Sequence, residues 1–319
     1  MGKVTARAHP NIALVKYWGK RDLALNLPAV PSVSLTLDGF VTTTTVTWGA
    51  PSDRVVFDGE VRSDPRALAF LDRIDADRPP CEVVTTNNFP TGAGLASSAS
   101  GFAALALAAS RAAGQTLDET SLSVLARQGS GSACRSIFGG FVAWDLGDRA
   151  DGLDDHARPL ASPIHWDVRM VVAVVADGPK AVGSTAGMER SRTTSPLWPA
   201  WVEQGPGAVQ GAIEAIEARD LERLGTIMEQ STFAMHATMQ TATPPLLYWQ
   251  PATVAVLHAV FGLRAKGVGA WATMDAGPQV KVLCEAADAD RVAEALRPYA
   301  IEVYVHGPGE GAHVVADDR

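Results

Sequence analysis

A glycine- and serine-rich segment at residues 87–101 stands directly before an alanine-rich run at 102–113. The segment reads NNFPTGAGLASSASG, so two glycines and several small side chains precede a helix-forming stretch. Backbone N–H groups at the start of a helix can close around a phosphate, because small residues allow close approach and the helix dipole favours an anion. Ser97 and Ser98 fall at the helix start, where a hydroxyl can cap the backbone, contact a phosphate oxygen or bind its metal ion. The segment predicts an anion site, although a bare glycine pattern also fits a plain turn into a buried helix.

The composition is that of an ordinary folded protein, with 47% hydrophobic and 19% charged residues. A length of 319 residues suits one large domain or two ordinary ones, and we favour two lobes. The net charge of −8 argues against a nucleic-acid partner, since phosphate backbones are bound by basic surfaces. An anionic small substrate would then need a locally basic pocket.

Cysteine and histidine spacing predicts neither a disulfide framework nor a structural metal. The three cysteines include no Cys-x-x-Cys pair, and the seven histidines show no ligand spacing, so free thiols in a reducing compartment are expected. Residues 89–110 carry no charge, but one proline, three glycines and four serines argue against a membrane helix. The N-terminus lacks an apolar signal core, so we expect a cytoplasmic protein without a membrane partner.

Hydrophobic periodicity alternates between strand and helix in both halves of the chain, which predicts an α+β fold. Residues 4–47 have extended character, and further strands are expected at 81–86, 141–144, 168–176, 268–273, 279–283 and 301–305. A first helix is expected to begin at Pro65, a second to cover the alanine-rich run, and a third to run from a capping box at 116–119 to Gly129. Further helices are expected at 207–240, 251–266 and 288–296.

The acidic stretch 145–167 contains two prolines and predicts an exposed connection between two lobes. We therefore divide the chain into an N-terminal lobe with the phosphate loop, residues 1–165, and a C-terminal α+β lobe, residues 166–319. The active site is expected in the cleft between them.

The longer string from Pro90 to Ala99, Pro-x-x-x-Gly-Leu-x-Ser-Ser-Ala, resembles the phosphate-binding motif of the GHMP small-molecule kinase superfamily. Its flanks, Asn87-Asn88-Phe89 and Gly101, resemble one family of that superfamily, the diphosphomevalonate decarboxylases. Segments 11–22 (NIALVKYWGKRD), 129–136 (GSGSACRS) and 275–278 (DAGP) resemble the same family in its order. The likeness spans most of the chain and implies a two-lobed GHMP-kinase-like fold.

The resemblance implies that the phosphate loop holds the phosphates of ATP together with Mg²⁺. The chain has no Gly-x-x-x-x-Gly-Lys-Ser/Thr motif, so a P-loop cradle is not expected. The residues assigned to the nucleotide by this resemblance are Asn87, Gly92, Ala93, Gly94, Leu95, Ala96, Ser97 and Ser98, with Ser98 as the Mg²⁺ ligand.

The resemblance places three residues at the reacting centre. Lys16 would lie at the transferred phosphoryl group, Arg135 would hold the substrate carboxylate, and Asp275 would face a tertiary hydroxyl. From the residues alone other interpretations stay open. Lys16 belongs to a basic cluster typical of a solvated strand end, Arg135 precedes a short helix, and Asp275 lies in an Asp/Gly/Pro turn.

The substrate pocket implied by the resemblance includes Arg66 at the substrate's diphosphate. The expected pocket residues are Tyr17, Trp18, Gly19, Lys20, Arg66, Ser130, Gly131, Ser132, Ala133, Cys134, Arg135, Ser184, Thr185 and Met188. The chain departs from the family where Pro-x-Asn-Ser-Ser is usual, since it reads Pro28-Ala-Val30-Pro31-Ser32. It also has His9-Pro10-Asn11 in place of a proline two residues before the asparagine. The first departure leaves open whether the substrate carries one phosphate or two.

The activity implied by the resemblance is ATP-dependent decarboxylation of (R)-5-diphosphomevalonate to isopentenyl diphosphate, with CO₂, ADP and phosphate as the other products. This is a step of the mevalonate pathway of isoprenoid biosynthesis, and a homodimer is expected. Three alternatives stay open: a decarboxylase of 5-phosphomevalonate, a small-molecule kinase that stops at the phosphate ester, and a nucleotide-binding protein without activity.

Overall fold

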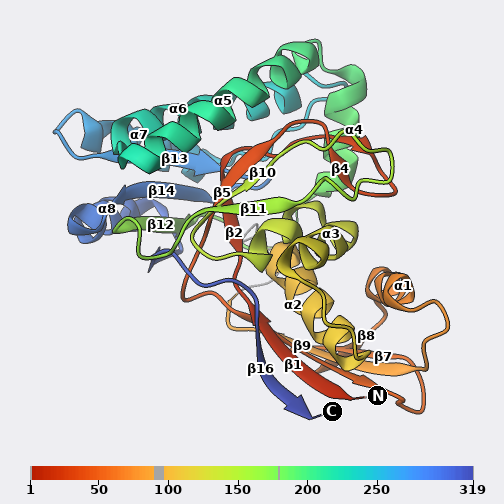
Figure 1. The fold of residues 1–319 in the computed structure, drawn as a ribbon. Coiled ribbons are helices and arrows are strands. Elements are labelled where there is room, and N and C mark those ends of the chain that lie inside the picture. Colours follow the sequence, from red (N-terminus) through yellow and green to blue (C-terminus); the bar gives the residue numbers. More distant parts are fainter. Residues whose placement is uncertain (1, 90–96, 179, 319) are drawn as a thin grey trace.

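The computed structural model describes residues 2–89, 97–178 and 180–318. Helices and strands alternate in both halves of the chain, and the predicted α+β class is confirmed. Figure 1 shows one sheet at the bottom of the molecule beneath α1–α3, and the helices α5–α7 at the top. Within the described ranges, none of the helices combines the length and the apolar character that a membrane span requires.

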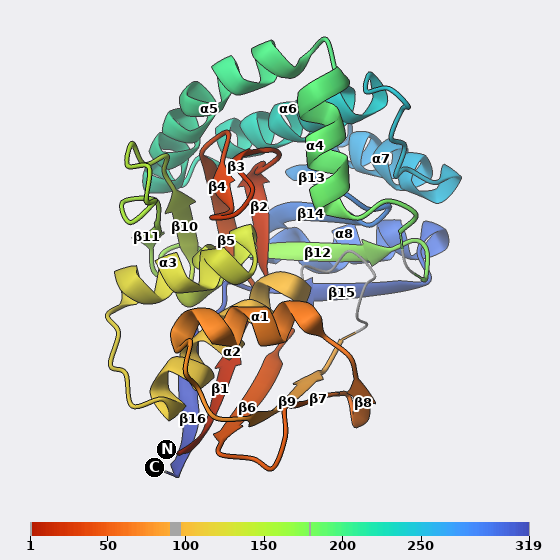
Figure 2. The same ribbon diagram turned by 90° about the vertical axis from the view of Figure 1, so that its right-hand side faces the viewer.

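The first sheet is built largely from the N-terminal part of the chain and is completed by its last strand. Its order is β16 (His313–Asp318), β1 (Lys3–Ala8), β6 (Thr42–Trp48), β9 (Cys81–Asn87), β7 (Arg54–Phe57) and β8 (Glu60–Arg62). β16 pairs antiparallel with β1, so the two ends of the chain lie together, as Figure 2 shows. The sequence patterns did not predict β16, which lies in the segment assigned to the second lobe. The division at residue 165 stays a prediction.

Two further sheets of four strands meet above the first. One has the order β11 (Ala157–Ala161), β10 (Phe141–Trp144), β5 (Ser32–Thr36) and β2 (Asn11–Val15). The other has the order β13 (Ala270–Met274), β14 (Val280–Glu285), β12 (Val168–Val174) and β15 (Glu302–His306). Leu35 and Phe141 of one sheet and Met170 of the other belong to one buried cluster. A small hairpin of β3 (Lys20–Asp22) and β4 (Leu27–Pro28) follows β2.

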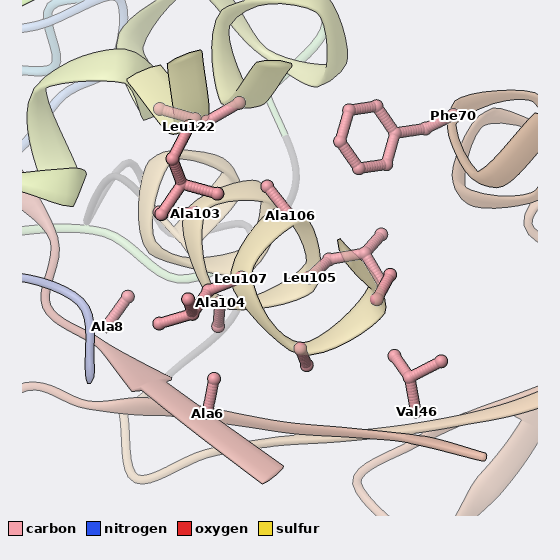
Figure 3. Packing of buried hydrophobic residues seen from close by; sticks show 14 of the residues in the cluster. Ala6, Ala8, Val46, Phe70, Ala103, Ala104, Leu105, Ala106, Leu107 and Leu122 are labelled. Carbon is pink, nitrogen blue, oxygen red and sulfur yellow. The ribbon is translucent and has the colours of Figure 1, made fainter. Parts of the chain in front are cut away.

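Helices α1 (Pro65–Ile74), α2 (Ser97–Ala112) and α3 (Glu119–Gly129) belong to the first part of the fold. α2 packs against β1 and β6 through alanines, and Figure 3 shows Ala104 facing the sheet that carries Ala6 and Val46. Small side chains allow the helix to lie close to the strands, which explains why an alanine-rich run is buried. The start of α2 is thereby fixed relative to the sheet.

The remaining α-helices are α4 (Ser184–Thr194), α5 (Trp198–Ala218), α6 (Leu221–Gln240), α7 (Pro251–Arg264) and α8 (Ala289–Leu296). Short 3₁₀ helices lie at η1 (Gly131–Ile137), η2 (Ala286–Asp288) and η3 (Arg297–Tyr299). The continuous helical pattern predicted over 207–240 is two helices, because the chain reverses at Arg219, which has a left-handed φ of 55°.

Two other local predictions were wrong. α3 begins after Asp118, whose carboxylate accepts from the backbone N–H of Ser121, so the cap does not start at Thr116. The acidic connection at 145–167 contains strand β11 and a fully buried Asp155. The Asp155 side chain accepts from the indole of Trp144 at 2.7 Å, and this bond draws the loop onto the sheet.

Candidate active site

A cleft of about 620 Å³ opens between segments from both halves of the chain. Most of the candidate residues from the sequence line it, together with several that the sequence did not indicate. The lining residues are Asn11, Ala13, Lys16, Tyr17, Trp18, Lys20, Arg66, Ser97, Ser98, Ser130, Gly131, Ser132, Arg135, Lys180, Gly183, Ser184, Thr185, Ala186, Met188, Met235, Asp275 and Ala276.

Asp275 sits between two buried lysines. Lys16 Nζ lies 2.7 Å from Asp275 Oδ1, and Lys281 Nζ lies 3.0 Å from Asp275 Oδ2. Lys16 follows β2, whereas Asp275 follows β13 and Lys281 lies opposite Thr273 in the antiparallel pair β13–β14. Both lysine side chains are 1% exposed, while the Asp275 side chain is 30% exposed. The carboxylate is therefore the most exposed member of this group.

Burial and charge oppose each other in this cluster. Burial acts to raise the pKa of Asp275, but the ammonium groups of Lys16 and Lys281 outweigh it and hold that pKa well below its ordinary value. Burial lowers the pKa of Lys16 to about 8, against the opposing effect of the Asp275 carboxylate. His236 of α6 is buried nearby, and burial together with the charge of Lys16 lowers its pKa to about 3. His236 is thus neutral at neutral pH.

Arg135 is a buried guanidinium held by neutral groups. Its Nε donates to Asn11 Oδ1 at 3.0 Å, and its Nη1 donates to Ser32 Oγ at 2.7 Å. Asn11 is fixed in turn by donating its amide to Ser136 Oγ at 2.8 Å. Burial lowers the pKa of Arg135, and among the ion pairs of the described residues none involves this side chain. A buried cation without a carboxylate partner can accept a ligand anion.

A second basic region lies along the same cleft. Lys20 Nζ donates to Asn26 Oδ1 at 2.6 Å, and Arg66 Nη2 donates to the Gly129 carbonyl at 2.6 Å. Burial, followed by the charge of Arg66, lowers the pKa of Lys20. Neither cation belongs to an ion pair in the part of the chain that the structure describes. Both are therefore available to a bound anion.

The first residues of α2 face the cleft from another side. Ser97 and Ser98 line it at the N-terminus of a helix of 16 residues. The predicted nucleotide residues 92–96 lie outside the described residues. Asn87 ends β9, where its Oδ1 accepts from Thr42 Oγ1 at 2.6 Å, and it is not among the cleft-lining residues described.

Close backbone approaches shape the pocket around Tyr17 and Trp18. A Cβ at Gly131 would lie 2.5 Å from the Tyr17 hydroxyl, so this position needs glycine. Gly19 has a φ of 104°, and a Cβ there would meet the ring of Trp198. Gly19, Ala133 and Cys134 support the pocket without lining it. Burial raises the pKa of the Cys134 thiol to about 12, so the thiol stays protonated at neutral pH.

Lys180 is a further basic residue of the cleft. Its Nζ donates to Ser184 Oγ at 2.6 Å and to the Ala276 carbonyl at 3.0 Å. Burial is the main effect that lowers its pKa. Ser184, Thr185 and Met188 of α4 line the cleft beside it. Sequence reasoning did not single out Lys180 or Lys281, and it named Asn11 only as part of a matched segment. Lys180 and Lys281 each stand alone among small or apolar neighbours, a pattern that carries no catalytic signal.

Comparisons with known proteins cover nearly the whole chain. Residues 8–157 match the family model described as diphosphomevalonate decarboxylase-like N-terminal domain. Residues 170–306 match the model described as mevalonate 5-diphosphate decarboxylase C-terminal domain. Diphosphomevalonate decarboxylase of Candida albicans is 35% identical over 99% of this chain and 92% of its own length.

Solved structures show the same similarity at the level of the fold. Mevalonate diphosphate decarboxylase from Staphylococcus aureus superposes with a TM-score of 0.93 at 36% identity, covering 99% of this chain and 98% of that one. A structure of MDDEF in complex with MVAPP, AMPPCP and magnesium gives a TM-score of 0.91 at 38% identity, covering 98% of both chains.

Proposed function

The chain belongs to the diphosphomevalonate decarboxylase family, and we propose that it converts (R)-5-diphosphomevalonate and ATP to isopentenyl diphosphate, CO₂, ADP and phosphate. ATP and Mg²⁺ are the cofactors, in line with the AMPPCP and magnesium held by the related MDDEF structure. The observation that carries the proposal is the pair of Lys16 and Asp275 in one cleft with a buried Arg135 that lacks a carboxylate partner among the described ion pairs. Lys281 pairs with the same carboxylate from outside the cleft lining.

The start of α2 fits a nucleotide polyphosphate. A helix N-terminus offers unpaired N–H groups and the positive end of its dipole, and Ser97 and Ser98 add hydroxyls on the cleft side. We assign these serines to the ATP phosphates, with Ser98 as a ligand of Mg²⁺. Asn87 and residues 92–96 complete the assigned set. The metal, when bound, neutralises charge on the phosphates.

Asp275 is assigned to the substrate's 3-hydroxyl as an acceptor that orients it toward the phosphoryl donor. A carboxylate whose pKa is held low by two ammonium groups stays ionised but is a weak base. Phosphoryl transfer depends mainly on alignment and charge stabilisation, so orientation is the larger part of this role. Lys16 would offset the negative charge that develops on the transferred phosphoryl group.

Decarboxylation then follows from the phosphate ester. The C3–O bond breaks and its electron pair leaves with phosphate, which places positive charge at C3. The bond to the carboxylate carbon breaks next, and its electron pair forms the double bond as CO₂ leaves. Arg135 would hold the carboxylate in the orientation that this bond cleavage requires, because Asn11 and Ser32 fix its guanidinium.

The other pocket residues are assigned to the body and the phosphate end of the substrate. Lys20 and Arg66 would bind the diphosphate, since both reach the cleft without an ion-pair partner among the described residues. The rest of the substrate would be enclosed by residues 17–19 and 130–134 and by Ser184, Thr185 and Met188.

We further propose the lobe division 1–165 and 166–319, a homodimer, and a cytoplasmic location. Sedimentation of the purified protein tests the dimer.

The decisive assay measures ADP and CO₂ together on mevalonate, its monophosphate and its diphosphate. Equal amounts of ADP and CO₂ from the diphosphate alone are expected. ADP without CO₂ would favour a kinase that stops at the phosphate ester. Preference for the monophosphate would favour the alternative decarboxylase, which the Val30-Pro31 departure leaves open. Protection by ATP against unfolding, without turnover, would overturn the enzymatic proposal.

A further inference from the structure

We propose that Asn26 is a positioning residue that tethers Lys20 at the phosphate end of the substrate. The inference rests on the proposed function, because it deepens the role given to Lys20. Asn26 lies in the turn between β3 and β4 and has a left-handed φ of 55°, which asparagine tolerates better than most residues. It is 8% exposed and is not among the residues that line the cleft.

The Asn26 side chain forms hydrogen bonds on both sides. Its Oδ1 accepts from Lys20 Nζ at 2.6 Å. Its Nδ2 donates to the carbonyl of Arg127 at 3.0 Å and to the carbonyl of Gln128 at 2.9 Å. The amide therefore bridges the lysine and the last turn of α3.

The same helix end holds the other cation of this region. Arg66 donates directly to the carbonyl of Gly129, the last residue of α3. The C-terminal carbonyls of a helix carry partial negative charge, so they stabilise nearby cations without neutralising them. Lys20 and Arg66 are thus brought side by side at one helix end, where burial and then the charge of Arg66 lower the pKa of Lys20. That arrangement leaves positive charge for a phosphate.

A neutral tether is what this location requires. A carboxylate at position 26 would form an ion pair with Lys20 and repel an incoming phosphate, and it would face two carbonyls that it cannot donate to. The turn is anchored independently of Asn26, because the buried side chain of Arg127 donates to the carbonyl of Leu25 at 3.1 Å. Removal of the amide should therefore release Lys20 more than it disturbs the turn.

The test compares wild-type kinetics with Asn26→Gly, Lys20→Ala and the double variant. Glycine accepts the left-handed φ, so the substitution removes the tether without backbone strain. We expect Asn26→Gly to raise KM for the diphosphate substrate roughly tenfold with little change in kcat, as for loss of uniform binding. In the Lys20→Ala background the same substitution should change KM little, since the tethered group is gone.

Arg219→Gly is the matched control, because Arg219 is an exposed residue with the same φ of 55° at a distant helix end. Its KM should stay at the wild-type value. Asn26→Asp is the second variant, and it should raise KM above that of Asn26→Gly.

The outcomes separate the two proposals. An inactive wild-type protein would remove the proposed function itself. An active wild type with an unchanged KM in Asn26→Gly and Asn26→Asp would overturn the tether. A fall in kcat alone, or a full additional effect of Asn26→Gly in the Lys20→Ala background, would also overturn it. If Asn26→Gly melts below the assay temperature, Asn26→Asp decides, and a wild-type KM there counts against the tether.

Discussion

At the scale of single residues, the ionisation of Lys16 sets an expected pH limit. Its pKa lies at about 8, below the ordinary lysine value, because the side chain is buried. The charged form is the one assigned to the phosphoryl group, so kcat/KM should fall as the pH rises through about 8. Around Lys16, Asp275 is held ionised, His236 is neutral, and Lys281 and Arg135 are the neighbouring cations. A pH profile of kcat/KM from pH 7 to 10 measures this fall. The midpoint of the fall reports the pKa of the group in the free enzyme.

Lys16→Arg is the companion variant, since arginine stays charged throughout that range. Whatever its absolute rate, its profile should lose the decline near pH 8. Lys180→Arg and Lys20→Arg control for the two other cleft lysines whose pKa burial lowers. A flat wild-type profile, or a decline that persists in Lys16→Arg, would contradict the assignment.

Asp275→Asn separates a catalytic carboxylate from a turn residue. Asparagine keeps the size and suits the turn, but it cannot hold the 3-hydroxyl as an anion or balance Lys16 and Lys281. We expect kcat to fall by roughly two to four orders of magnitude, while substrate binding changes little because other residues hold the substrate's anionic ends. Kinetics, a binding titration and a thermal melt measure the three effects.

The control for Asp275→Asn is Asp290→Asn, which removes an exposed carboxylate from α8. Wild-type turnover in Asp275→Asn would show that the residue acts in the turn alone. The melt also reports the cost of removing the negative charge that the buried ammonium groups of Lys16 and Lys281 share.

Sequence reasoning reached the site only where a family motif marked it. Lys16, Arg135 and Asp275 were named by resemblance, and they line one cleft; their roles stay predictions. Lys281 was missed because it lies in the strand segment VKVLC, where a single charge resembles that of an exposed edge. Asn26 was missed, and Asn11 was given no role, because amides that hold a cation have no characteristic spacing. Asn11 contacts Arg135, 124 residues away, and Asn26 contacts the end of α3, 101 residues away, and no local pattern contains such contacts.

At the scale of elements, α2 illustrates how side-chain size determines how closely a helix lies against a sheet. Ala104 is fully buried against the first sheet. We expect Ala104→Leu to destabilise the protein by about 1 to 3 kcal/mol, because added methylenes overpack a close interface. Denaturant unfolding measures the change.

Gly207→Ala in α5 is the matched control for Ala104→Leu, since an added Cβ there meets nothing within 4 Å in the described part of the chain. Gly207→Ala should raise the free energy of unfolding by roughly 0.5 to 1 kcal/mol, the usual gain of alanine over glycine in a helix. Equal stability of Ala104→Leu and the wild type would mean that α2 is not closely packed.

Local signals predicted elements well where they were chemically strong. α1 begins at Pro65, as expected, and the structure adds Asp64 as its cap. The boundaries failed where tertiary contacts decide them, as in the buried Asp155 that draws the acidic loop inward. β16 was missed because its side chains are largely exposed, and its pairing with β1 joins residues at opposite ends of the chain. Such pairing leaves little hydrophobic pattern in a single segment.

At the scale of the whole molecule, the C-terminal segment connects the two parts of the fold in two ways. β16 adds an edge strand to the first sheet. Residues 307–312, just before it, bond to the segments that carry the Arg135 site. Gly309 N–H donates to the Thr36 carbonyl at 2.7 Å, and Ala312 N–H donates to the Ile137 carbonyl at 3.1 Å. Thr36 ends β5, which carries Ser32, and Ile137 ends η1, which carries Arg135.

Two truncations distinguish these roles. Removal of residues 313–319 leaves β1 unpaired on one side, but it removes mostly exposed side chains, and it spares every described residue of the cleft. We expect a lower melting temperature, a greater tendency to aggregate through the free strand edge, and a kcat close to wild type below the melting transition.

Removal of residues 307–319 also breaks the bonds to Thr36 and Ile137, so the groups that fix Arg135 lose their support. Here kcat should fall more than the melting temperature alone explains, with ADP release less affected than CO₂ release, because the carboxylate would be held poorly. If both truncations lost activity in proportion to stability, the segment at 307–312 would contribute to folding alone.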